Sequence, residues 1–176
     1  RQDRYRYQFE GGQYTEYVFA GPDMPGILEA YTELTGRTAA PPLWALGMHQ
    51  CRFHAYVQDE VLELGRKYRD RGIPCDVLWL DIDYMSGFRV FTWDPKKFRD
   101  PRTMIAKLHD QEFRVVAIVD PGVKHEPGYP VFEEGYARGL FCQTESGKLY
   151  EGQSWPGRVV FPDLSRAEVR QWWAGL

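Results

Sequence analysis

The sequence is poor in cysteine. Its 176 residues include three, Cys51, Cys75 and Cys142, an odd number without Cys-X-X-Cys spacing. This pattern argues against a disulfide framework and against a structural zinc site. We therefore expect three small, buried, free thiols, which favour a reducing compartment such as the cytoplasm.

Long apolar runs and clustered charge are also missing. No stretch approaches the roughly 20 apolar residues of a membrane-spanning helix, and the N-terminus carries no signal-peptide pattern. The net charge is -3 and the basic residues form no stripe, so neither a nucleic acid nor a membrane is expected as a partner. Aromatic residues, in contrast, make up 15% of the chain, a surplus that suits stacking on sugars as well as core packing.

Strand and helix signals alternate after a Pro-rich connector at 39–42. Before the connector, residues 13–20 predict a strand and 27–35 a short helix. After it, strands are expected over 43–48, 75–82 and 114–119, and helices over 57–71, 101–112, 130–138 and 169–176. This order predicts parallel βαβ units, in either a (β/α)8 barrel or a doubly wound sheet. A full barrel needs about 250 residues, so at most three or four of its eight units fit.

Polar residues follow the end of each expected strand. The first is followed by 49–53 (HQCRF), the second ends in Asp81 and Asp83, and the third ends in Asp120. In both candidate folds the functional residues lie at the carboxyl ends of the strands. Because residues 49–53 are not a Gly-rich phosphate loop, a nucleotide site is disfavoured.

Asp81 and Asp83 are the first candidates for chemistry. Strand alternation puts both on one face, pointing into the mouth of a barrel. The two catalytic carboxylates of a glycosidase lie on either side of the scissile bond, so we reject this same-sided pair for that role. Two other interpretations stay open: loop caps or ion pairs with Arg52 or Arg89, and the divalent-metal site of a glycosyltransferase.

Six short motifs resemble glycoside hydrolase family 31, in order and in separation. They are 46–52 (LGMHQCR), 81–85 (DIDYM), 91–94 (FTWD), 118–122 (IVDPG), 155–157 (WPG) and 161–163 (FPD). The resemblance runs from about Tyr14 to the end of the chain. It implies a retaining α-glycosidase of α-glucosidase type on a (β/α)8 barrel, with an α-glucoside oligosaccharide as substrate and with no cofactor or metal.

The resemblance also implies a division of the chain. Residues 1–22 would end a preceding β-sandwich domain, 23–42 would be a connecting helix and linker, and 43–176 would form the N-terminal part of a truncated catalytic barrel. It leaves open the choice among α-glucosidase, α-xylosidase and related activities, the linkage preference and the oligomeric state.

Five residues match positions that line the sugar pocket of the family. Asp81 matches the carboxylate that binds hydroxyls at the non-reducing end of the sugar, and Ile82 lies beside it. Ile118 matches an apolar wall residue and Trp155 an aromatic one. Phe53 stands where the family usually has Trp or Tyr, so it keeps a stacking face without a polar group.

The catalytic residues of the family have no counterpart in the sequence. Its nucleophile is an Asp in a Trp-X-Asp-Met-Asn-Glu-like strand, expected beyond Leu176, and its acid/base Asp comes later still. We therefore expect the 176-residue chain alone to be inactive. A non-catalytic carbohydrate-binding or structural fragment is the alternative, and a metal-dependent glycosyltransferase is a more distant one.

Overall fold

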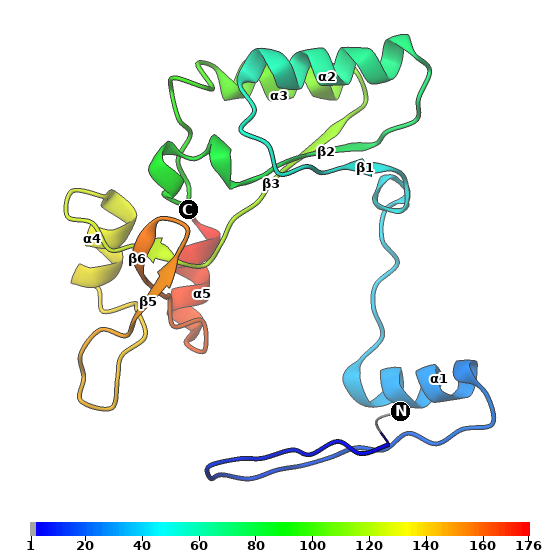
Figure 1. Ribbon diagram of the computed structural model, residues 1–176, viewed down its shortest axis with the longest axis vertical. Helices are drawn as coiled ribbons and strands as arrows, with labels where there is room; N and C mark the ends of the chain where they lie inside the picture. The colour runs from blue at the N-terminus through cyan, green and yellow to red at the C-terminus, as the bar shows by residue number, and fades with distance from the viewer. Residues whose placement is uncertain (1–2) are drawn as a thin grey trace. The chain divides into compact units, whose positions relative to one another are not determined.

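A three-stranded parallel sheet, ordered β1-β2-β3, organises the larger part of the chain (Figure 1). Its strands are β1 (His49–Gln50), β2 (Val77–Leu80) and β3 (Arg114–Ala117). The computed structural model describes residues 3–176, which divide into two units, Arg1–Pro41 and Pro42–Leu176. The alternation of strands and helices predicted from the sequence is confirmed for the three parallel strands.

The smaller unit contains one helix, α1 (Met24–Thr35). Asp23 caps it, because its side chain accepts a hydrogen bond from the amide of Gly26 at 2.9 Å, and Pro25 stands in the first turn, where its missing N–H costs nothing. The strand predicted over 13–20 is not formed: these residues join no strand ladder within residues 3–176. Tyr14 and Tyr17 stay more than half exposed, so no burial compensates for ordering a strand here.

The first strand of the sheet begins later than predicted. Residues Leu43–Leu46 form a 3-10 helix, η1, because the amide of Ala45 bonds back to the carbonyl of Pro42 at 2.9 Å. Pairing with β2 starts at Met48, whose carbonyl accepts from the amide of Asp76 at 2.8 Å. The prediction of a strand over 43–48 was therefore wrong, since its apolar composition did not distinguish a strand from a tight turn.

Two helices, α2 (Gln58–Asp70) and α3 (Pro101–Asp110), lie side by side against one face of this sheet (Figure 1). Val61 on α2 and Met104 and Leu108 on α3 are fully buried, as their helical spacing predicts. Val57, which the same spacing puts on the buried stripe, precedes α2 and is 37% exposed. Leu78 and Leu80 of β2 belong to the same core cluster. The helices thus hold β2 in place and direct its carboxyl end away from them.

A second, antiparallel sheet, which the sequence did not reveal, follows β3. Its strands are β4 (Val123–Lys124), β5 (Glu151–Ser154) and β6 (Gly157–Val160), in the order β4-β6-β5. The strand β5 reads EGQS and β4 has two residues, so neither carries a hydrophobic period. The helices α4 (Pro130–Ala137) and α5 (Ala167–Ala174) match the two predicted at 130–138 and 169–176.

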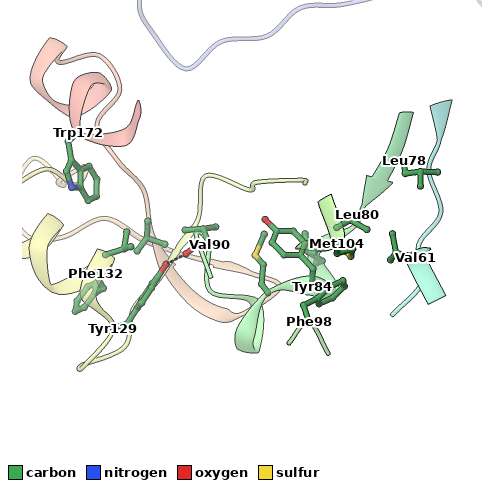
Figure 2. Packing of buried hydrophobic residues seen from close by; sticks show 14 of the residues in the cluster. Val61, Leu78, Leu80, Tyr84, Val90, Phe98, Met104, Tyr129, Phe132 and Trp172 are labelled. Atoms are coloured by element: carbon green, nitrogen blue, oxygen red, sulfur yellow. Dashed lines mark hydrogen bonds between the residues drawn. The ribbon is translucent and has the colours of Figure 1, made fainter. Parts of the chain in front are cut away.

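One continuous core joins the two sheets (Figure 2). Figure 2 shows Phe98 beside Tyr84 near β2, and Tyr129 beside Val90 nearer the second sheet. The buried hydroxyl of Tyr129 donates to the carbonyl of Val90 at 2.6 Å. Burial raises the pKa of Tyr129, so this hydroxyl keeps its proton and the hydrogen bond persists. Tyr129 stands just before α4, and Val90 lies in the loop between η3 (Ser86–Phe88) and α3. Their buried hydrogen bond therefore holds this loop against the start of α4.

All three thiols are free, as predicted, but their burial differs. Cys75 is buried, Cys142 is half-buried and Cys51 is exposed, so the expectation of three buried thiols was wrong for Cys51. It lies just beyond β1, where the chain leaves the sheet. Among the described residues, no helix has both the length and the apolar composition to cross a membrane.

Replacing Met104, which is 0% exposed, tests the packing between the helices and the sheet. We expect Met104→Ala to lower the free energy of unfolding by about 2–5 kcal/mol, because it removes buried surface and leaves a cavity. Arg102→Ala, at an exposed position of the same helix, should change it by less than about 0.5 kcal/mol. Urea unfolding followed by circular dichroism measures both, and similar values for the two variants would contradict the packing described.

Candidate functional site

Asp81 occupies the first position after β2. The chain turns there into a 3-10 helix, η2 (Ile82–Tyr84), and the carboxylate caps it by accepting from the amide of Ile82 at 2.8 Å. This turn ends the strand alternation. The prediction that Asp83 shares a face with Asp81 was therefore wrong. Instead, the backbone carbonyl of Asp83 accepts from the ammonium of Lys97 at 2.9 Å.

The end of β3 is tied to the end of β2. The amide of Ile118 donates to the carbonyl of Leu80 at 3.0 Å, which extends the parallel pairing by one step. The hydroxyl of Tyr84 donates to the carbonyl of Ile118, also at 3.0 Å. Burial and, second, the charge of Asp120 raise the pKa of Tyr84 to about 12, so it remains a donor at neutral pH.

Trp155 comes from the antiparallel sheet. It stands in the two-residue turn between β5 and β6, where Ser154 pairs with Gly157. Gly157 has a φ of 95°, a left-handed conformation that a glycine adopts without strain and that lets the hairpin close around Trp155 and Pro156. The indole is held at the tip of a hairpin and is 67% exposed.

These strand ends and the hairpin tip surround one open cleft of about 420 Å³. Its lining consists of Phe53, Asp81, Ile82, Ile118, Asp120 and Trp155. All five residues predicted to bind substrate therefore lie together, although they come from four separate regions of the sequence. Their proximity is a property of the structure, whereas their roles in binding stay predictions.

The sixth lining residue, Asp120, was not among the predicted binding residues. It could have been found from the sequence, because it closes the third strand as Asp81 closes the second. The two carboxylates accept hydrogen bonds, the two isoleucines are apolar, and the rings of Phe53 and Trp155 are exposed. No Lys or Arg lines the cleft. Such a surface suits a neutral ligand that has many hydroxyl donors and flat CH faces.

The metal-site interpretation of Asp81 and Asp83 loses its geometric basis. Asp83 does not line the cleft, and its side chain faces Lys97, with oxygen and nitrogen 4.0 Å apart. In the part of the chain that the structure describes, no three His, Cys, Asp or Glu side chains are grouped so as to hold a metal ion. The alternative pairing of Asp81 with Arg52 or Arg89 is also absent there, since Arg89 binds Glu126 instead.

A larger depression, about 790 Å³, lies between α4 and the segment that leads to β5. His125, Phe132 and Tyr136 form part of its wall, and it contains none of the predicted site residues. Size alone does not make it the better candidate, because the smaller cleft is where the strand ends and carboxylates converge.

Comparison with known proteins identifies the family of the chain. Residues 38–176 match the family described as "Glycosyl hydrolases family 31 TIM-barrel domain". "Alpha-glucosidase 2" of Bacillus thermoamyloliquefaciens is 46% identical over 97% of this chain, and human "Neutral alpha-glucosidase AB" is 42% identical over the same share. The matched regions are 22% and 18% of those two relatives.

Solved structures give the same result. A crystal structure of the glucosidase II alpha subunit superposes with a TM-score of 0.84 and 38% identity, over 89% of this chain and 17% of that one. The dextranase of Flavobacterium johnsoniae superposes with a TM-score of 0.79 and 32% identity, over 88% of this chain and 19% of that one. The chain thus spans about a fifth of the length of these relatives. From its sequence and its fold together, the chain belongs to glycoside hydrolase family 31, within the TIM-barrel domain.

Proposed function

We propose that this chain supplies the first strands of the catalytic barrel of a retaining α-glycosidase, which removes terminal α-linked glucose from oligosaccharides. The observation that carries the proposal is the cleft, in which Asp81, Ile82, Ile118, Phe53 and Trp155 come together. Membership of family 31 supports the reaction class. In this proposal the chain contributes part of the sugar-binding wall and leaves bond cleavage to other strands.

The names of the relatives support the choice of sugar. Several are called α-glucosidases, and the glucosidase II alpha subunit was crystallised bound to "alpha3-Glc2". The dextranase was crystallised in complex with isomaltotriose. All of these names point to α-linked glucose, so we propose the same sugar for the cleft around Asp81.

Each of the five residues predicted to bind substrate has a physical role in this proposal. The carboxylate of Asp81 accepts hydrogen bonds from sugar hydroxyls, and these strengthen as positive charge develops on the ring in the transition state. Its orientation is set by the amide of Ile82, so little entropy is lost on binding. The exposed rings of Phe53 and Trp155 stack on the sugar, while Ile82 and Ile118 exclude water from its apolar edge.

The cleavage itself requires two carboxylates on opposite sides of the glycosidic bond. Asp81 and Asp120 follow neighbouring parallel strands, so both approach a bound sugar from the same wall. We therefore propose that neither is the nucleophile or the acid/base, and that these come from later strands of the family's barrel. The sugar would pass through a covalent intermediate with net retention.

The N-terminal unit has a separate role in the proposal. We assign residues 1–22 to the end of a β-sandwich domain and 23–42 to the connection into the barrel. The support is that Tyr5, Tyr7 and Tyr17 are each more than 60% exposed, and that α1 buries no residue within its own unit. Exposed aromatic surface of this extent is typical of a contact with another domain.

Hydrolysis by the isolated chain is the first test. We expect residues 1–176 alone to release no nitrophenol from nitrophenyl α-glucoside, while a full-length family 31 polypeptide that includes them does, because the catalytic pair is outside this segment. Absorbance of nitrophenolate measures both. Turnover by the isolated chain would show that a pair within it, such as Asp81 and Asp120, is catalytic.

Asp81 and Asp83 form a matched pair of substitutions in the full-length polypeptide. We expect Asp81→Asn to lower kcat/KM by about a hundredfold, because a hydrogen bond to a charged acceptor is lost in the transition state. Asp83→Asn should stay within about threefold, since its side chain lies outside the cleft. Equal losses would instead favour a joint role of the two aspartates.

Removal of divalent cations tests the glycosyltransferase alternative. After dialysis against EDTA, the initial rate of glucoside hydrolysis should be unchanged, and added Mn²⁺ or Mg²⁺ should not raise it. The reason is that Asp81 and Asp120 are the two carboxylates among the residues that line the cleft, fewer ligands than a divalent cation prefers. A rate that falls with EDTA and returns with Mn²⁺ would contradict the proposed mechanism.

A further inference from the structure

Asp120 has a position that the roles given so far do not explain. It lies two residues beyond Ile118, which is level with Asp81 because β2 and β3 pair Leu80 with Ala117. Asp120 therefore lies beyond the carboxyl end of β3, past the level of Asp81, and lines the same cleft.

Its carboxylate is partly buried and has no partner of its own. Within residues 3–176, no hydrogen bond or ion pair involves its side chain. The charge of Asp120 acts on the phenol of Tyr84, whose proton is already donated to the carbonyl of Ile118. A half-buried carboxylate needs a donor from water, from a ligand or from another part of the barrel.

Asp120 and Trp155 line two cavities together. Both residues line the open cleft and a small void that includes Ile82 and Gly122. The carboxylate therefore lies where an aromatic face and the cleft meet. A sugar stacked on Trp155 would bring the hydroxyls at its edge to this point.

We infer that Asp120 is a second sugar-binding carboxylate, which accepts a hydrogen bond from a hydroxyl other than the one bound by Asp81 and so helps to select the sugar. This inference rests on the proposed function. In this inference the cleft binds the sugar through two carboxylates, Asp81 and Asp120, while the sugar stacks on Trp155. A sugar that lacks one of the two hydroxyls would leave one carboxylate without its hydrogen bond and would be a poorer substrate.

The test pairs a protein change with a substrate change. Full-length wild type, Asp120→Asn and the control Asp110→Asn, at an exposed position at the end of α3, are assayed with nitrophenyl α-glucoside and its 2-, 3-, 4- and 6-deoxy analogues. We expect Asp120→Asn to lower kcat/KM on the parent glucoside by about ten- to a hundredfold. On one deoxy analogue the same variant should cost less than about threefold, because the contact is already missing.

The ratio of kcat/KM between two substrates separates a lost contact from a folding defect. Within one variant, the ratio of kcat/KM for two substrates does not depend on the fraction of active protein, so a partly misfolded variant cannot imitate the pattern. Asp110→Asn should reproduce every wild-type ratio.

Two results would overturn the inference while leaving the proposed function intact. One is an equal loss on the parent and on all four analogues, which would mean that Asp120 acts through the structure of the cleft. The other is an unchanged kcat/KM on the parent. A wild-type polypeptide that hydrolyses none of these glycosides would instead refute the proposed function itself.

Discussion

The pairing between β2 and β3 is the constraint on which the cleft depends. Because the strands are parallel and in register from Val77 to Leu80, their carboxyl ends reach the same edge of the sheet. The bond from the amide of Ile118 to the carbonyl of Leu80 extends that register past the last strand residues. Asp81 and Ile118 are adjacent for this reason, and any slip of one residue would turn the aspartate away from the cleft.

A second constraint places an aromatic ring over that edge. The segment after Asp120 enters β4 within three residues, so the antiparallel sheet begins where the parallel one ends. Val159 of β6 packs against Gly122, where a Cβ would lie 3.3 Å from its side chain. That close approach, together with the tight turn at Gly157, carries Trp155 to the cleft. The exposed ring of Trp155 and the carboxylates of the cleft thus come from two sheets joined by one short connection.

Hydrophobic periodicity in the sequence predicted the helices and the central strands. Elements that depend on hydrogen bonding to other segments were not predicted. The helices α2 and α3 were found because their buried stripes recur with helical spacing, and Asp81 was found because an apolar strand ends on it. The 3-10 turn at Leu43–Leu46 was taken for a strand, since a short apolar run fits either structure. Asp83 was assigned to the face of Asp81 because nothing in the sequence indicates that η2 ends the alternation. The sheet β4-β6-β5 was missed because β5 is polar, β4 has only two residues, and β4 pairs with β6, which is distant in sequence.

The separation of sugar binding from bond cleavage follows from the geometry of a parallel sheet. Carboxylates at neighbouring strand ends share a wall, so they can hold one side of a sugar but cannot attack and protonate it from opposite sides. In a closed barrel, strands that are far apart in the sequence face each other across the mouth, so carboxylates can lie on opposite sides of a bound sugar. In the function that we propose, Asp81, Ile118 and Asp120 bind the sugar just beyond the ends of neighbouring strands, while the reacting pair comes from across the barrel.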